Sequence, residues 1–177
     1  MDELNDLVSE SLGISQRDRA LISDFMNVRL ELNDGKVGRP AIRSPKVTEM
    51  KQYAKRLRDE LDHYMGAESG YRHSVDTIYD SATGMICVDF FTAKKTAAVS
   101  VVAADRETAA ELSAAREALH QEIGQWIYFD RDLRIHAGTK TYLFKPMQLF
   151  HWTESQAMID ANEIIAETVA ATEGVAN

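Results

Sequence analysis

Cysteine is nearly absent from this sequence, and its scarcity excludes two common ways of stabilising a fold. A single cysteine, Cys87, stands in 177 residues, so the chain cannot form an internal disulfide. No CxxC motif or Cys/His cluster has the spacing of a structural zinc site. The fold must therefore rest on a hydrophobic core, and a chain of this length buries roughly 70% of the surface that it exposes when unfolded.

Long hydrophobic runs are also lacking. No stretch approaches the roughly 18 apolar residues of a membrane helix. The first residues, Met1 to Asp6, are acidic and do not contain the apolar segment of a signal peptide. A lone cysteine is typical of proteins in a reducing compartment. We expect a soluble cytoplasmic protein that does not bind membranes.

Catalytic signatures are missing as well. Gly-rich phosphate loops of the Walker or dinucleotide type do not occur, and no histidine belongs to an HxH or HExxH motif. Asp130, Asp132 and His136 alternate along a predicted strand and could hold a divalent ion for hydrolysis. A solvated strand face explains the same alternation. We therefore expect no metal and no cofactor, and a non-catalytic protein is favoured over an enzyme.

The few prolines and glycines show where helices end in the N-terminal third. Two of the three prolines lie in the segment 35–45, which is therefore predicted to be neither a helix nor a central strand. Before this loop, apolar residues at helical spacing predict helices over 4–12 and 15–32. After it, the sequence predicts a helix over 45–66 with Ser44 as its N-cap.

Beyond residue 70 the period of the apolar residues changes from 3.6 to 2. The pattern predicts, in order, three strands, a helix, two strands and a helix: 72–79, 85–91, 97–103, 105–123, 126–136, 139–145 and 153–169. Short connections between the first three strands indicate an antiparallel meander. The order α-α-α-βββ-α-ββ-α predicts one α+β domain, residues 1–177, with helices packed on a five-stranded antiparallel sheet. Residues 1–35 could be a separable helical arm that pairs with a second chain.

The second hairpin decides which side chains of the last two strands face the core. A turn at Ala137-Gly138 would place Asp130 opposite Lys145, as a cross-strand ion pair on the solvent side. The alternation predicts an outward set consisting of Asp130, Asp132, Arg134 and His136. It predicts a core set consisting of Phe129, Leu133, Ile135, Tyr142 and Phe144.

What the sequence has in excess is a basic segment inside an acidic chain. Residues 36–58 hold eight Lys or Arg and one acid, although the formal net charge of the chain is −8. The helical period divides this segment into a Gly/Pro loop and one outward stripe of a helix. Segregated charge of this kind predicts a binding surface. We call it the basic surface, and its residues are Lys36, Arg39, Arg43, Lys46, Lys51, Lys55 and Arg58.

Two kinds of partner fit the basic surface. A protein partner or a second copy is favoured, because residues 67–177 carry sixteen acids against nine basic residues and would repel a nucleic acid that touched more than the patch. Nucleic acid is the alternative, since the patch can neutralise several phosphates. The triplet Gly38-Arg39-Pro40 resembles the centre of an AT-hook, although Val37 stands where that motif has its first arginine.

The connector 146–152 is the densest apolar and aromatic segment. Pro146 has no N–H for a sheet ladder and is predicted to end the preceding strand. The favoured interpretation is that the connector fills the core between strand and helix. Alternatively, Met147, Phe150 and Trp152 are exposed anchors for a protein partner.

These patterns lead to three ranked hypotheses. The first is a non-catalytic adaptor or accessory subunit, which binds a protein partner or its own copy through the basic surface. The second is a nucleic-acid-binding accessory protein of a DNA- or RNA-acting complex. The third is a metal-dependent hydrolase that uses Asp130, Asp132 and His136.

Overall fold

The computed structural model describes residues 2–30, 39–123 and 133–175. The helices are α1 (Asp2–Ser11), α2 (Gln16–Asp24), α4 (Arg39–Ile42), α5 (Val47–Met65), α6 (Arg106–Ile123) and α7 (Glu154–Val175). Single tighter or wider turns are η1 (Phe25–Arg29), η2 (Ala67–Ser69) and η3 (Leu149–His151). The strands are β1 (Tyr71–Tyr79), β2 (Thr83–Thr92), β3 (Val99–Ala103), β4 (Leu133–Ala137) and β5 (Lys140–Pro146).

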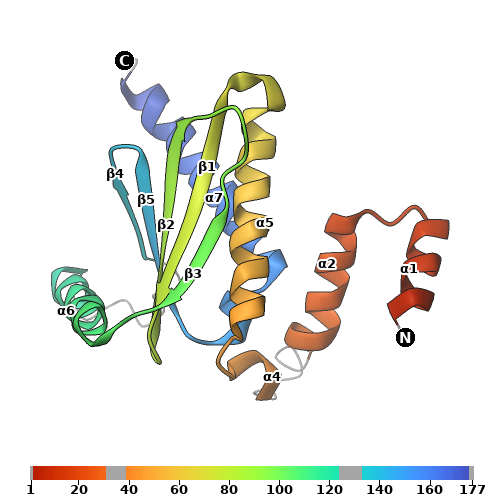
Figure 1. Cartoon of the computed structure of the whole chain (residues 1–177), viewed down its shortest axis with the longest axis horizontal. Coiled ribbons are helices and arrows are strands. Elements are labelled where there is room, and N and C mark those ends of the chain that lie inside the picture. Colours follow the sequence, from red (N-terminus) through yellow and green to blue (C-terminus); the bar gives the residue numbers. More distant parts are fainter. Residues whose placement is uncertain (1, 31–38, 124–132, 176–177) are drawn as a thin grey trace.

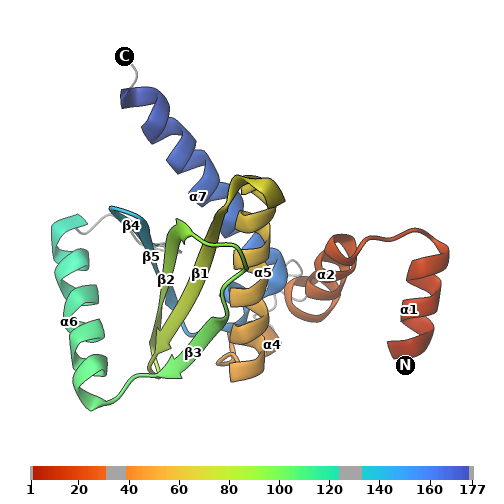
Figure 2. The ribbon, with the colours of Figure 1, turned by 45° about the horizontal axis from the view of Figure 1, so that its top comes forward.

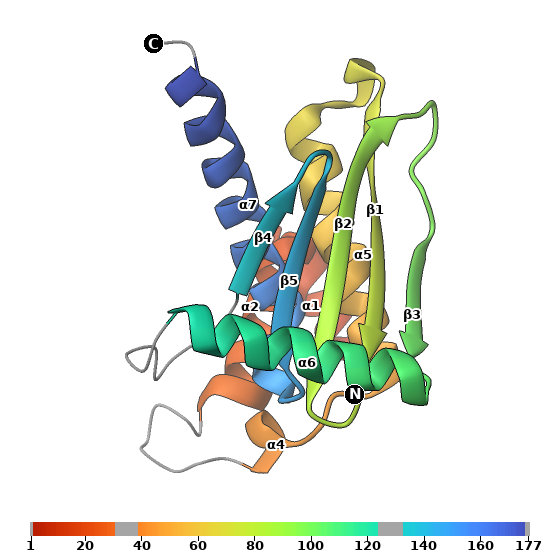
Figure 3. The same ribbon diagram turned by 90° about the vertical axis from the view of Figure 1, so that its left-hand side faces the viewer.

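The α+β class and the five-stranded sheet are confirmed. The strands lie in the order β3-β1-β2-β5-β4. Helices α5 and α7 cover one face of this sheet, and α6 crosses one end of the other face (Figures 1 and 3). Within the described residues, no helix has both the length and the apolar character needed to cross a bilayer.

The position of β3 differs from the predicted meander. β3 pairs in parallel with β1, from Val75 opposite Val99 to Tyr79 opposite Ala103, so the sheet is mixed. It cannot lie beside β2, because β5 occupies that edge of β2. The connection after β2 instead crosses to the far side of β1, where Arg58 Nη1 of α5 donates to the carbonyl of Ala97 at 2.6 Å.

Helix starts follow local side-chain chemistry. Asp18 N–H donates to Ser15 Oγ at 3.1 Å, and Thr108 N–H donates to Asp105 Oδ1 at 2.8 Å, so both predicted N-caps are confirmed. The start of α5 was predicted two residues too early. Its N-cap is Lys46, whose backbone N–H donates to Glu49 Oε2 at 2.7 Å. The Gly/Pro loop also contains the short helix α4, which the sequence did not predict.

The core lies between the sheet and the pair α5 and α7. Helix α5 buries one face, which consists of Met50, Tyr53, Ala54, Leu57 and Leu61. Against it pack the inward residues of the central strands and the connector before α7, among them Val75, Ile86, Val88, Leu143 and Trp152. The apolar residues that recur with the helical period in α5 therefore pack in one cluster with those that alternate along the strands.

The second hairpin faces the opposite way from the prediction. Its turn is Gly138-Thr139, so His136 pairs with Thr141 and Arg134 with Leu143. The buried side chains of β5 are Thr141, Leu143 and Lys145, which share the α7 side of the sheet with Arg134 and His136. The apolar set Leu133, Ile135, Tyr142 and Phe144 lies half-buried on the other face. The predicted assignment of faces was therefore wrong, and Phe129, Asp130 and Asp132 lie outside the described residues.

A buried ion pair explains why the second hairpin faces this way. Lys145 Nζ lies 2.5 Å from Asp160 Oδ2 of α7, and neither side chain is exposed. Tyr53 Oη donates to the same carboxylate oxygen, and Gln156 Nε2 donates to Asp160 Oδ1 at 3.0 Å. The carbonyl of His151 accepts from Lys145 at 3.3 Å. Lys145 therefore points into the core and not toward a residue across the hairpin.

Removing one partner of this pair should destabilise the fold strongly. Lys145→Met leaves Asp160 as a buried charge without its counter-ion, and we expect a loss of about 3–5 kcal/mol in the free energy of unfolding. Lys145→Met/Asp160→Asn should lose much less, because the amide that replaces the carboxylate is neutral and can still accept from Tyr53. Urea denaturation measures both. Lys140→Met, on the exposed part of the same strand, is the control, and an equal loss in Lys140→Met and Lys145→Met would contradict the prediction.

Gly84 allows the core aromatic to pack against the sheet. A Cβ at this position would overlap the indole of Trp152, at atoms Cζ2 and Cη2. The indole cannot easily move away, because its Nε1–H donates to the carbonyl of Pro146 at 3.0 Å and its ring meets Tyr53 edge-on at a centroid distance of 5.4 Å. The close approach of strand and ring therefore requires glycine.

Gly84→Ala should therefore lower the free energy of unfolding by about 1–3 kcal/mol through overpacking. The same change in a Trp152→Phe background should cost less, because the smaller ring leaves room for the methyl group. A double-mutant cycle by thermal or urea unfolding measures this coupling. Additive effects of the two substitutions would show that the overlap is not the cause.

Candidate protein-interaction surface

The structure divides the basic surface into engaged arginines and exposed lysines. Arg43 Nη1 donates to Glu49 Oε2 at 2.9 Å. This hydrogen bond raises the pKa of Arg43 and lowers the pKa of Glu49. Arg58 binds Asp59 at 2.6 Å in addition to the carbonyl of Ala97. Both arginines therefore hold the fold together locally, and their charges are matched by acids.

Three lysines keep the character expected of a binding surface. Lys46, Lys51 and Lys55 are exposed on the N-terminal half of α5 and have no ion pair with a described residue. Arg39 begins the short helix α4, and Lys36 lies outside the described residues. The part of the basic surface that the structure shows to be exposed and without an ion pair is thus smaller than the set of residues that the sequence predicted.

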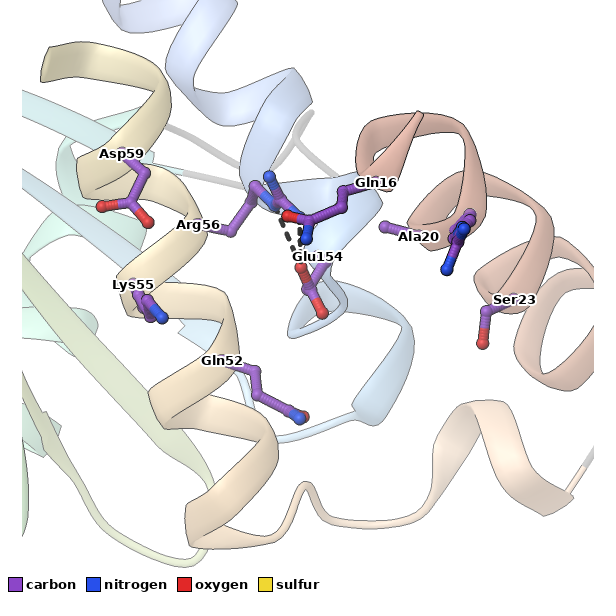
Figure 4. A pocket seen from close by; sticks show the side chains of 9 residues that line it. Gln16, Ala20, Ser23, Gln52, Lys55, Arg56, Asp59 and Glu154 are labelled. Carbon is purple, nitrogen blue, oxygen red and sulfur yellow. Dashed lines mark hydrogen bonds and ion pairs between the residues drawn. The ribbon is translucent and has the colours of Figure 1, made fainter. Parts of the chain in front are cut away.

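A polar groove of about 500 Å³ runs between α2 and α5 beside these lysines. Figure 4 shows Lys55, Arg56 and Asp59 reaching into it from α5, and Gln16 and Ser23 from α2. Arg56 Nη2 lies 2.8 Å from Glu154 Oε2 of α7. Both cations (Arg19, Lys55 and Arg56) and carboxylates (Asp59 and Glu154) line the groove, so it offers hydrogen bonds and charges of both signs to a polar partner.

Exposed apolar side chains gather on the N-terminal arm, which we define as residues 2–30 and which contains α1, α2 and η1. Figures 1 and 2 show α1 projecting away from the sheet, with α2 between it and α5. Leu12 is 70% exposed, Leu7 64% and Met26 59%. The other exposed apolar side chains of the arm are Val8, Leu21, Ile22, Phe25 and Leu30. An amphipathic helix with its apolar side in solvent is typical of an interaction element.

The second half of the arm is anchored to the body by a buried carboxylate. Asp24, only 6% exposed, accepts from Thr153 Oγ1 at 3.0 Å, from Ser155 Oγ, and from Arg29 Nε at 2.8 Å. Arg29 Nη2 also donates to Gln156 at 3.1 Å. These bonds tie the end of α2 to the start of α7. They hold the arm in place while α1 remains unpacked.

The connector before α7 belongs mainly to the core. Met147 and Trp152 are buried, and Trp152 contacts Tyr53. Phe150 is half-buried, and its ring lies 3.8 Å from that of His151. Met147 and Trp152 therefore fill the core, as the favoured interpretation of this segment predicted. Their side chains are not accessible to a protein partner.

Of the three residues considered for hydrolysis, the structure describes only His136. His136 Nδ1 lies 3.0 Å from Thr141 Oγ1, and its Nε2 lies 2.8 Å from Glu167 Oε2. Asp130 and Asp132 lie outside the described residues. Among the residues that the structure describes, no group of three His, Cys, Asp or Glu side chains could hold a metal ion.

Cys87 lies half-buried on the sheet face opposite α5 and α7, where burial raises the pKa of its thiol. A raised pKa leaves little thiolate at neutral pH, so this cysteine is a poor nucleophile. It packs as a small side chain in a central strand.

The sequence predicted the helices of the arm but not the exposure of their apolar side chains. Leu21 and Phe25 belong to the apolar side that predicts the helix over 15–32, and both are more than two-fifths exposed. Periodicity reports that a helix has an apolar side and does not report what covers it. The one available signal was the Gly/Pro loop, which separates this segment from the rest of the chain.

Comparison with known proteins adds no relative, since no family model, no curated protein and no solved structure matches this chain.

Proposed function

We propose that this protein is a non-catalytic adaptor or accessory subunit whose N-terminal arm binds another polypeptide, in the first instance a second copy of this chain. The observation that carries the proposal is the row of exposed apolar side chains on α1, α2 and η1. Burying a Val, Leu, Ile, Met or Phe side chain contributes about 1.5–3 kcal/mol. Eight such residues are more than a monomeric domain leaves in water without a use.

Charge complementarity favours a second copy as the occupant. Helix α1 carries Asp2, Glu3, Asp6 and Glu10 and no basic residue. The exposed Lys46, Lys51 and Lys55 of α5 provide the opposite charge. In one chain α1 points away from α5 (Figures 1 and 2), so acidic arm and basic surface meet only if they come from different molecules. A two-fold dimer would form this contact twice.

The nucleic-acid alternative depends on the same lysines. Two arginines of the basic surface already have carboxylate partners, and Asp59 and Glu60 lie on the same helix. The charge left for phosphates is therefore small compared with the charge of the whole segment 36–58. A protein contact needs only a few cations beside an apolar surface, and the three exposed lysines of α5 are enough for that role.

Substitution of the arm should abolish self-association and leave the domain folded. Leu7→Ser/Leu12→Ser removes the two most exposed apolar side chains of α1 and its C-terminal end, and we expect the full-length protein to change from dimer to monomer in size-exclusion chromatography with light scattering. The free energy of unfolding should stay within about 0.5 kcal/mol of the parent, because these side chains do not pack on the core. Val102→Ser, at an exposed apolar residue of β3, is the matched control.

Charge reversal tests the pairing of arm and basic surface. Lys51→Glu/Lys55→Glu should weaken the dimer at least tenfold, and Asp6→Lys/Glu10→Lys in the same chain should restore it. Lys94→Glu/Lys95→Glu is the control, since both lysines are exposed away from the arm. If the parent protein is monomeric at all concentrations, the proposal that it self-associates is wrong. Tight, salt-dependent binding of labelled DNA or RNA that is lost in Lys51→Glu/Lys55→Glu would favour the alternative.

A further inference from the structure

Helix α7 diverges from α5 toward its C-terminal end (Figures 1 and 3). A cavity of about 340 Å³ lies there, on the core face of the sheet. Val88 and Phe90 of β2 form its floor. The C-terminal parts of the two helices form its walls, through Leu61 and Tyr64 on α5 and Ile164 on α7. Its volume falls in the range of small-molecule sites, and its walls are largely apolar. It is separate from the arm and from the groove beside α2.

One imidazole in this cavity, that of His73, is hydrogen-bonded to a described residue through only one of its two nitrogens. His73 is 8% exposed, and its Nδ1 lies 3.0 Å from Asp62 Oδ1. The same oxygen accepts the backbone N–H of His73 at 2.8 Å, and Asp62 Oδ2 accepts from Thr96 at 3.2 Å. Asp62 acts as an acceptor, so in the neutral form of the ring the proton lies on Nδ1. Nε2 is then a lone-pair acceptor, and it has no hydrogen-bond partner among the described residues.

The second imidazole of the cavity is already hydrogen-bonded through both of its nitrogens. Both ring nitrogens of His136 are engaged, with Thr141 and Glu167. Arg134 Nε donates to Glu167 Oε1 at 3.0 Å. His136 also lies on β4, three strands from β1, so at a strand spacing of about 4.8 Å the two imidazoles cannot act on one atom. His73 Nε2 is therefore the imidazole nitrogen of the cavity to which no described residue is hydrogen-bonded.

From this geometry we infer that the cavity binds a small neutral hydroxyaromatic compound, with its hydroxyl donating to His73 Nε2. A few polar groups placed in a largely apolar site fix the orientation of a ligand, and an acceptor there selects a ligand that brings a donor. A flat ring fits beside Phe90, whose ring already lies 5.2 Å from that of His73. An anion is disfavoured, since Glu167 lines the cavity and Asp62 stands behind His73. This ligand site does not depend on the proposed function of the arm.

The probe pair 2-naphthol and 2-methoxynaphthalene tests the inference, because the two molecules share the ring system and only the first has a donor. Isothermal titration calorimetry of the full chain should show saturable binding of 2-naphthol, with the methyl ether at least fivefold weaker. His73→Phe keeps an aromatic ring without the acceptor and should reduce this ratio to near one. His63→Phe, at an exposed histidine of α5, should leave the ratio unchanged.

The ¹⁵N chemical shift of His73 Nε2 gives a measurement on the unaltered protein, which keeps the test valid if His73→Phe does not fold. It should move upfield on addition of 2-naphthol, as a lone-pair nitrogen accepts a hydrogen bond, and stay in place with the ether. Absence of saturable 2-naphthol binding, equal affinity for the two probes, or a preference that survives in folded His73→Phe would overturn the inference.

Discussion

The buried pair of Lys145 and Asp160 is the interaction on which the rest of this structure depends. Lys145 comes from β5, Asp160 from α7, and Tyr53, which donates to Asp160, from α5. One hydrogen-bonded group thus joins the sheet to both helices that cover it. Removing two charges from water is costly, and their attraction offsets that cost only in a well-satisfied geometry. Here both carboxylate oxygens accept hydrogen bonds, and Lys145 Nζ also lies 5.0 Å from the centre of the Tyr53 ring.

The orientation of the hairpin follows from this pair. Side chains alternate across a strand, so an inward Lys145 also turns Leu143 and Thr141 inward. Pairing with β5 then places Arg134 and His136 on the same side, where two glutamates of α7 receive them. Hydrogen bonds to these glutamates raise the pKa of Arg134 against the opposing effect of burial. A polar row lies under α7, and a half-buried apolar row is left on the opposite face.

Features that depend on residues close together in the sequence were predicted correctly. Features that depend on a contact with another helix or strand were not. The period of α5, which also fixed the outward side of its lysines, and the caps Ser15 and Asp105 act over a few residues. The place of β3 depends on β5, a later strand that takes the free edge of β2. Glu154, which pairs with Arg56 of α5, lies on α7 and becomes its partner only after folding. The exposed apolar side chains of the arm and the Nε2 atom of His73 have no described residue packed or hydrogen-bonded against them. The period of apolar residues in a sequence gives no information about such missing contacts.

Helix α7 connects the arm, the ion pair and the cavity, and this raises the question of whether they act together. Asp24 holds its first turn through Thr153 and Ser155, Asp160 holds its middle, and Ile164 borders the cavity beyond. Coupling between sites requires an element with two arrangements that both sites bias. A helix fixed at its start and at its middle by buried carboxylates has one arrangement in that segment. The ion pair therefore separates the arm from the cavity, and a partner bound to one is expected to leave affinity at the other unchanged.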